Sequence, residues 1–167
     1  MDQQNKMKEK FLNLVEMHQG IIHKILSIYT YDTEDRKDLL QEIMLQLWKS
    51  FPSFREKSAF STWMYKVVLN TALLHKRKKM KEKYSVDALI ENRAMQMGTA
   101  KNDISISLYM AIDQLGPVDK AIALLYLEQK SYQEIENILG MNKNNIGVRI
   151  SRIKDKLKKI FEYEQQL

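Results

Sequence analysis

Aromatic and basic side chains follow one another between Phe51 and Lys83, and their chemistry suits a single-stranded nucleic acid. A polar loop after Pro52 comes first, and aromatic residues open the helix predicted behind it. The stretch ends in a dense run of Lys and Arg over residues 76–83, opposed only by Glu82. Cations attract phosphates and aromatic rings stack on bases, so the two together predict a single-strand site. Cations also complement the C-terminal end of a helix dipole, so part of the run needs no ligand.

No arrangement of side chains in this sequence predicts covalent catalysis or metal binding. His18 and His23 are five residues apart, which separates them around a helix, and no matching carboxylate or third histidine accompanies them. Without Cys the chain has no thiolate ligand, thiol nucleophile or disulfide. No Ser/His/Asp or phosphate-loop constellation is present either. We therefore expect a protein that is not an enzyme and that needs no metal or cofactor.

The composition is that of a soluble helical protein. The chain has 167 residues, 44% of them hydrophobic and 29% charged, which allows one ordinary domain or two small ones. Five Gly and two Pro are too few for a turn-rich β fold. The net charge of +6 favours a polyanionic partner without identifying it. The N-terminus is polar and no segment approaches the ~20 apolar residues of a membrane span, so we expect a cytosolic protein.

Apolar residues recur at helical spacing through the first half of the chain. The pattern predicts a helix over about 7–29, which Gly20 could break, and a strongly amphipathic helix over about 34–50. Pro52 ends the second helix, and a further helix follows over about 59–79. Four polar side chains lie off the apolar stripe of the 34–50 helix, and the pattern alone indicates a solvated surface there. They are Asp38, Gln41, Glu42 and Gln46.

A polar segment over 84–102 indicates a linker between two helical units. Beyond it, helices are expected over about 104–115 and 117–128, divided at Gly116 and Pro117. The sequence therefore predicts an all-α fold of two small helical domains joined by a flexible linker, the second of them a helix-turn-helix domain.

The helix-turn-helix prediction rests on local signals after residue 130. Ser131 and Glu134 have the spacing of a capping box, and Gly140 is placed to end the short helix that the box begins. Asn142 can cap a last helix that continues to about residue 159. Two short helices around a turn with Gly, the second basic at its start, match a helix-turn-helix, although other helical hairpins share the pattern.

In a helix-turn-helix, the first residues of the second helix reach base edges in the major groove. Arg pairs well with guanine and Asn with adenine, whereas Lys is as often on phosphate. The candidates are Lys143, Asn144, Asn145, Arg149 and Arg152. Gly147 lies among them and either permits a close approach of the DNA backbone or only weakens the helix.

Three stretches carry a resemblance to a bacterial RNA polymerase sigma factor of the extracytoplasmic-function (ECF) type. They are Asp38–Trp48 (DLLQEIMLQLW), Phe54–Asn70 (FREKSAFSTWMYKVVLN) and Leu115–Leu157. The match covers nearly the whole chain except the linker, with both units in the right order and separation. The loop departs from many relatives in carrying Glu56 and Lys57 where they have Gly followed by an acid.

The resemblance implies roles that composition could not show. The helix from Glu34 to Phe51 looks like the segment that docks on the clamp helices of the polymerase β′ subunit, with Asp38, Gln41 and Glu42 in the interface. The loop over 55–60 resembles the loop that captures a base flipped from the minus-ten element. The residues implied for minus-ten binding are Arg55, Lys57, Ser58, Phe60, Trp63, Tyr65, Lys66, Asn70, Lys76 and Arg77. Trp63 could instead lie in the core and anchor the loop.

The prediction from the sequence is an alternative sigma factor that directs RNA polymerase to promoters and performs no covalent chemistry. Residues 1–83 would bind core polymerase, including its β′ and β subunits, and read and melt the minus-ten element. Residues 84–102 would be the linker, and residues 103–167 would read the minus-thirty-five element. The family further implies an anti-sigma factor as partner, alongside promoter DNA. Two alternatives stay open: a stand-alone helix-turn-helix regulator with a dimerising or ligand-sensing first half, and a pure interaction module.

Overall fold

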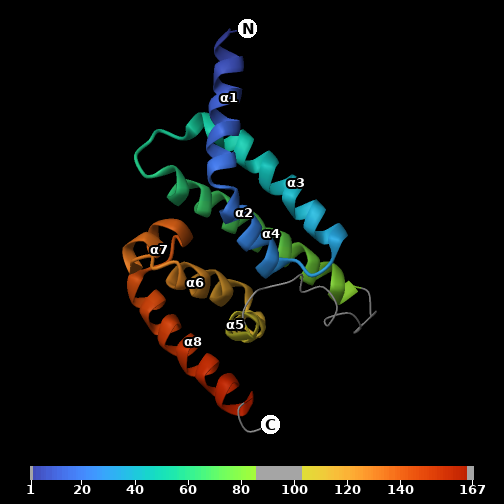
Figure 1. The fold of residues 1–167 in the computed structure, drawn as a ribbon, viewed down its shortest axis with the longest axis vertical. Coiled ribbons are helices and arrows are strands. Elements are labelled where there is room, and N and C mark those ends of the chain that lie inside the picture. The colour runs from blue at the N-terminus through green and yellow to red at the C-terminus, as the bar shows by residue number, and fades with distance from the viewer. Residues whose placement is uncertain (1, 86–102, 165–167) are drawn as a thin grey trace. The chain divides into compact units, whose positions relative to one another are not determined.

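The structure, a computed structural model, describes residues 2–85 and 103–164, and within these two ranges it is helical without a strand (Figure 1). The all-α prediction is therefore confirmed. The helices of the first range are α1 (Asp2–Met17), α2 (Gln19–Tyr29), α3 (Thr33–Ser50), the short 3-10 helix η1 (Phe51–Ser53) and α4 (Phe60–Ser85). Those of the second are α5 (Asp103–Asp113), α6 (Pro117–Leu127), α7 (Tyr132–Leu139) and α8 (Lys143–Glu164).

The chain divides into two compact units, Met1–His75 and Lys76–Leu167. The division falls inside α4, so the basic end of that helix is assigned to the second unit. The predicted linker over 84–102 lies outside the described residues except for its first two positions, which end α4.

The first unit begins with two helices that are separated at His18 and not at Gly20. The Nδ1 of His18 donates to the carbonyl of Leu14 at 2.8 Å, and its ring lies against that of Phe60, with 5.1 Å between ring centroids. Gly20 continues α2. The break that the sequence allowed at the glycine is thus two residues earlier, where the His18 side chain donates to the Leu14 carbonyl and its backbone N–H bonds to Val15.

Helices α3 and α4 are joined near the N-terminal end of α3 by a buried histidine. Asp32 caps α3, because its carboxylate accepts from the backbone N–H of Asp35 at 2.7 Å. The carboxylate of Asp35 in turn pairs with His75 Nε2 on α4 at 2.6 Å, and both side chains are only 5% exposed. The other ring nitrogen of His75 lies 3.2 Å from Glu42 on α3. Leu40 of α3 does not belong to the buried face of the helix, because it is 39% exposed.

An aromatic cluster holds the opposite end of the same helix pair. Phe51, which follows α3, lies edge-on to Phe11 of α1 and to Phe60 and Trp63 of α4, with ring centroids 5.2 to 6.4 Å apart. Phe54 of the loop contacts the rings of Phe60 and Trp63 at 5.4 and 5.2 Å. Both ends of the α3–α4 connection are therefore fixed, and only its middle projects.

The second unit contains the predicted helix-turn-helix. Both hydrogen bonds of the capping box are present: the Ser131 hydroxyl accepts from the backbone of Glu134, and the Glu134 carboxylate accepts from that of Ser131. Gly140 ends α7 with φ +68°, a conformation that favours glycine. Asn142 then accepts from the backbone of Asn144 at 2.8 Å at the start of α8. Helix α8 continues five residues beyond the predicted end at 159, to Glu164.

Candidate nucleic-acid interface

The loop between η1 and α4 has one residue in a left-handed conformation. Glu56 has φ +54°, a region that costs a residue with a side chain roughly 1 kcal/mol and that glycine enters freely. The carboxylate of Glu56 accepts from Lys10 Nζ of α1 at 2.8 Å. This hydrogen bond and the positive charge of Lys10 hold the pKa of the Glu56 carboxyl below its ordinary value. A glycine would adopt this backbone conformation without strain.

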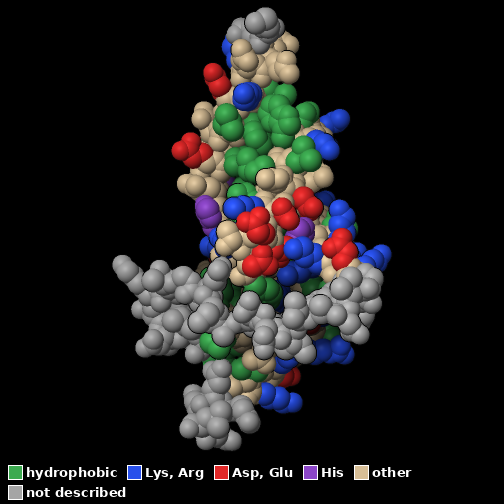
Figure 2. Space-filling view, turned by 90° about the vertical axis from the view of Figure 1, so that its right-hand side faces the viewer, with side chains coloured by type: hydrophobic (Ala, Val, Ile, Leu, Met, Phe, Trp, Pro, Cys, Tyr) green, Lys and Arg blue, Asp and Glu red, His purple; other side chains and the backbone are tan. Residues whose placement is uncertain are grey.

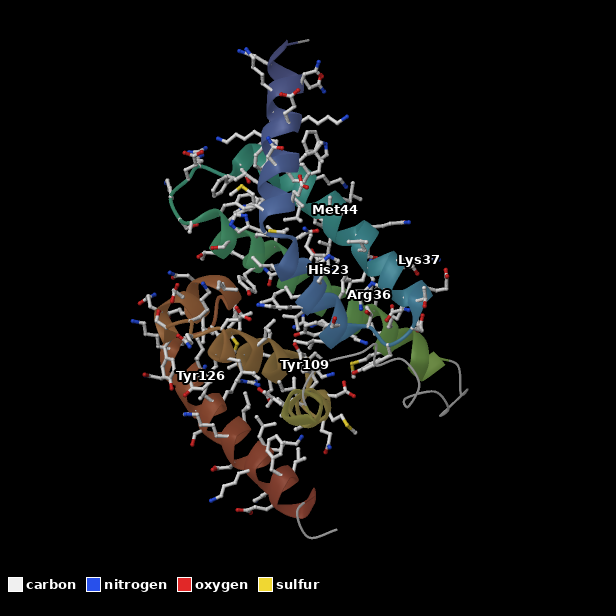
Figure 3. The ribbon with its side chains drawn as sticks, in the orientation of Figure 1. His23, Arg36, Lys37, Met44, Tyr109 and Tyr126 are labelled. Carbon is white, nitrogen blue, oxygen red and sulfur yellow. The ribbon has the colours of Figure 1, made fainter. Side chains whose placement is uncertain are left out.

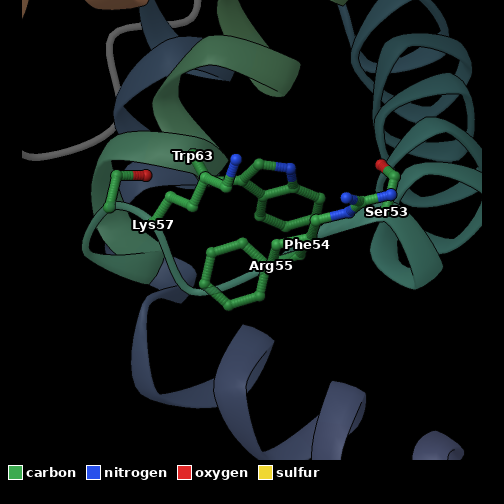
Figure 4. A pocket seen from close by; sticks show the side chains of 6 residues that line it. Ser53, Phe54, Arg55, Lys57 and Trp63 are labelled. Carbon is green, nitrogen blue, oxygen red and sulfur yellow. The ribbon is translucent and has the colours of Figure 1, made fainter.

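The projecting loop and the start of α4 enclose an open pocket with a volume of about 310 Å³ (Figure 4). Figure 4 shows the side chains of Lys57 and Arg55 on either side of the Trp63 indole. The lining residues offer two cations, two hydroxyls and two aromatic rings. They are Ser53, Phe54, Arg55, Lys57, Ser58 and Trp63. A ring face with flexible cations beside it can stack a base and neutralise the attached phosphate.

The predicted aromatic residues divide into pocket and core. Trp63 is half-buried and combines both roles, because it lines the pocket and packs in the aromatic cluster. Phe60 and Tyr65 are 8% and 3% exposed. Their rings are therefore enclosed by the protein, and in this structure they hold the loop and helix in place without facing solvent.

One face of α4 continues from the pocket toward the basic end of the helix. Positions 63, 66, 70 and 77 lie within about 60° of one another around a helix, because each residue turns it by ~100°. Lys66, Asn70 and Arg77 on this face are exposed. Lys76 is half-buried and turned away from them. The exposed face thus presents an amide between two cations, with the pocket at one end.

The surface of α3 combines polar and apolar side chains. Asp38 and Gln41 are exposed, while the Glu42 side chain is 40% exposed and partly engaged by His75. Leu40 and Leu45 are also exposed large apolar side chains on this helix. Figure 2 shows hydrophobic side chains gathered on the first unit, with acidic side chains next to them. Figure 3 labels Arg36, Lys37 and Met44 along α3, and Lys37 forms a local pair with Glu34 at 3.0 Å.

Three of the five predicted base readers share one face of α8. Asn145, Arg149 and Arg152 lie within about 60° of one another by helical rotation. Ile146, Ile150 and Ile153 face the core and are buried. Lys143 and Asn144 are exposed in the first turn but point in other directions around the helix.

Arg149 has a partner that the sequence did not reveal. One of its terminal nitrogens donates to Asp119, near the start of α6, at 2.6 Å, and the two side chains are 40% and 33% exposed. The remaining guanidinium donors leave the group able to contact a second acceptor. The ion pair therefore fixes the position of the Arg149 side chain without using all of its hydrogen-bond donors.

Gly147 lies beside an aromatic ring of the preceding helix. A Cβ built on it would be 3.5 Å from Tyr132 Cε2, which is an ordinary van der Waals contact. A side chain as small as that of alanine is therefore compatible with the packing. In the same unit, Lys154 Nζ lies 4.6 Å from the ring centroid of Tyr126, which Figure 3 labels on α6.

The described residues form neither a metal-binding cluster nor a membrane-spanning helix. Among residues 2–85 and 103–164 there is no group of three or more His, Asp or Glu side chains placed to hold a metal ion. None of the described helices is long and apolar enough to cross a membrane.

The structure also brings residues to the candidate sites that sequence reasoning left out. Ser53 and Phe54 line the loop pocket. Lys10 reaches the loop from 46 positions away in the chain, and Asp119 reaches Arg149 from 30 positions away. Ser53 and Phe54 could have been predicted, because they belong to the loop that precedes Trp63. No local pattern in the sequence indicates Lys10 or Asp119.

Two family descriptions match the chain, one in each half. Residues 14–82 match sigma-70 region 2, and residues 105–157 match sigma-70 region 4. The first match includes the pocket and the exposed face of α4, and the second includes the helix-turn-helix.

Curated proteins and solved structures agree with these matches. The chain is 25% identical to the RNA polymerase sigma factor SigV of Bacillus subtilis, over 91% of each chain. It is 29% identical to the ECF RNA polymerase sigma-E factor of Escherichia coli K12, over 89% of this chain and 84% of the relative. The fold resembles that of the sigma factor RpoE crystallised with the anti-sigma factor NepR from Bartonella quintana, with a TM-score of 0.69 and 22% identity, over 94% of this chain and 97% of that one. It also resembles CnrH in complex with the cytosolic domain of CnrY, with a TM-score of 0.64 and 16% identity, over 93% of this chain and 90% of that one.

Proposed function

Because the chain belongs to the ECF-type sigma factors of bacterial RNA polymerase, we propose that its two units divide promoter recognition between the loop pocket with α4 and the helix-turn-helix. The protein is a transcription initiation factor that directs polymerase to promoters. In our assignment residues 1–83 bind core polymerase and act on the minus-ten element. Residues 84–102 link them to residues 103–167, which read the minus-thirty-five element.

The observation that carries the minus-ten assignment is the open pocket over Trp63 at the start of the exposed α4 face. Extracting a base from a duplex costs stacking energy, which contacts in a pocket must offset. Here the indole offers a stacking surface, while Arg55 and Lys57 supply the charge that holds a phosphate. Asn70, exposed between cations on the same face, is in position to contact the strand next to a captured base.

The minus-thirty-five assignment rests on the first turns of α8. Asn145 and Arg152 are exposed and share one side of the helix with the half-buried Arg149. Lys143 and Asn144 lie at the N-terminus of the helix, where phosphate contacts are favoured. We assign base contacts to the first three and phosphate contacts to the other two.

The polymerase contact is assigned to the exposed surface of α3. Asp38 and Gln41 face solvent on the same side of the helix as the exposed Leu45, a mixture of polar and apolar groups that suits a protein partner. Glu42 contributes to the same surface while also holding His75. The partners in this proposal are the β′ clamp helices and the β subunit of core polymerase, promoter DNA, and an anti-sigma factor, the last by analogy with the complexes of similar fold.

Sigma factors act through binding, and we propose that this chain likewise performs no covalent chemistry and acts in the cytoplasm, where polymerase is. The test is run-off transcription with purified core polymerase and a library of genomic fragments. We expect transcripts that start at a defined set of promoters and that require the chain. If no promoter-dependent transcript forms and the chain does not co-purify with core polymerase, the proposal is wrong.

Substitution of Asn70 separates the two units. Asn70→Ala should lower open-complex formation, measured by permanganate reactivity of unpaired thymines, while duplex binding through the helix-turn-helix is kept. Asn13→Ala, an exposed change of the same residue type on α1 and outside the assigned sites, is the matched control. A stand-alone helix-turn-helix regulator would instead bind a palindromic duplex and ignore core polymerase, so core co-purification distinguishes the two functions.

A further inference from the structure

The only acidic side chain of the loop over 54–59 is not part of the pocket. Glu56 lies between Arg55 and Lys57 in the chain, and both of these neighbours line the pocket while Glu56 does not. Its backbone has φ +54°, which turns its side chain differently from those of its neighbours. Lys10 of α1 then holds its carboxylate at 2.8 Å. The pocket is thus left with cations, hydroxyls and rings, but without a carboxylate.

This lining distinguishes bases by one chemical group. Guanine and thymine carry a carbonyl oxygen at purine position 6 or pyrimidine position 4, and adenine and cytosine carry an amino group at the same place. Lysine and arginine can only donate hydrogen bonds, and charge-assisted bonds are stronger than those to neutral groups. A carbonyl can therefore accept from Arg55 or Lys57, whereas an amino group can donate to neither cation and finds only the neutral hydroxyls of the two lining serines as acceptors. A carboxylate in the pocket would reverse this by accepting from the amino group.

We propose that the pocket selects a keto base, thymine or guanine, because Lys10 holds the Glu56 carboxylate outside it. Lys10 is thus a positioning residue for base selection, although it belongs to another helix and does not line the pocket. This inference rests on the proposed base-capture function and adds to it the chemical class of the base.

The pair Lys10 and Glu56 is exposed, which makes both residues open to substitution. Their side chains are 58% and 67% exposed, so replacing either one leaves the core intact. Lys10→Gln frees the carboxylate and should admit amino bases. Glu56→Gln removes the same ion pair together with the carboxylate, and should keep the keto preference. A role limited to holding the loop in shape would make the two variants behave alike.

The experiment measures binding of the single-stranded oligonucleotides dU12 and dC12 by fluorescence anisotropy. Uracil and cytosine share a ring and differ in the group at position 4, and a homopolymer makes the register of the captured base irrelevant. The full chain is assembled with core polymerase, and the signal of core polymerase alone is subtracted. Lys8→Gln, an exposed change of the same charge on the same helix, is the matched control.

We expect the assembled wild-type protein to bind dU12 at least about fivefold more tightly than dC12, the lower end of what a good base-edge contact confers. Lys10→Gln should bring the ratio close to one, while Lys8→Gln and Glu56→Gln keep it. Equal binding of dU12 and dC12 by the wild type would overturn the inference and leave base capture standing. A keto preference that survives in Lys10→Gln would overturn the role of Lys10. Binding of neither strand above core polymerase alone would instead refute the proposed base capture.

Discussion

Arg149 is both an ion-pair partner and a proposed base reader, and two substitutions can separate these roles. Arg149→Met removes the charge and keeps an unbranched side chain. Asp119→Asn removes the other half of the pair and leaves the arginine in place. Both break the 2.6 Å contact between α6 and α8.

The expected cost to stability is small and equal for the two variants. The side chains are 40% and 33% exposed, so solvent screens much of their attraction. Partly exposed ion pairs contribute about 1 kcal/mol or less, and we expect each substitution to lower the free energy of unfolding by roughly that amount. Urea denaturation of the full chain, followed by circular dichroism, measures it.

The expected cost to DNA binding differs between them. A good contact to a base edge is worth about 1–3 kcal/mol of discrimination, so Arg149→Met should weaken binding to a selected minus-thirty-five duplex about 5- to 150-fold. Asp119→Asn should change that affinity by no more than about twofold, because the guanidinium remains free to contact the base. Fluorescence anisotropy on a duplex first selected with the wild-type protein gives both numbers.

Two results would refute this reasoning. If Asp119→Asn weakens binding as much as Arg149→Met, the arginine acts by joining α6 to α8 and not by reading a base. If Arg149→Met binds the selected duplex as tightly as the wild type, Arg149 does not belong to the interface at all.

Three further predictions concern stability, each measured by denaturation of the full chain. His75→Leu should lower the free energy of unfolding by about 3 kcal/mol, because it leaves a buried carboxylate of α3 without this partner. Glu42→Gln loses only the more exposed contact of His75 and should lower it by less than about 1 kcal/mol. Equal losses would contradict the role of His75 in joining α3 to α4. Gly147→Ala should raise the free energy of unfolding by up to about 1 kcal/mol, because the added Cβ makes only ordinary van der Waals contacts and glycine disfavours a helix. A lower free energy of unfolding would show that the Tyr132 ring cannot adjust to the new methyl group. The Ser131 backbone and hydroxyl lower the pKa of the Glu134 carboxyl, so its charge should stabilise the protein above the ordinary glutamate pKa and cease to do so as the pH falls through the lowered value. Glu134→Gln should therefore be less stable than the wild type at pH 7 and equally stable in strong acid. A difference in stability that does not change with pH would exclude the charge as its cause.

The helices and their ends were predictable from the sequence because they depend on neighbours in the chain. Apolar spacing predicted the helices over 34–50 and 117–128 within a residue or two of their observed bounds. The capping box at Ser131 and the left-handed Gly140 are formed by residues within one or two turns, and both are present. The break between α1 and α2 lies at His18 and not at Gly20, where the sequence allowed one, and at His18 the side chain donates to the Leu14 carbonyl.

The candidate site was predictable only in part. Its location in the loop and on α4 follows from local composition, because cations, hydroxyls and aromatic rings crowd one stretch of chain. Which rings line the pocket does not follow, since Phe60 and Tyr65 are aromatic like Trp63 but lie in the core. Burial of these rings depends on how α4 is rotated against its neighbours. The first turns of α4 carry aromatic residues on several sides, so their spacing does not specify that rotation.

By itself, the sequence determined a helical chain with a basic, aromatic stretch in its first half and a capped helix-turn-helix in its second. The tertiary structure alone decided which charges are engaged. Lys10 meets Glu56 across 46 positions, and Asp35 meets His75 across 40. Such pairs leave no periodic or local trace, because they form only when packed helices bring distant residues within a few ångströms. The first of these pairs holds the one carboxylate of the loop, which does not line the pocket.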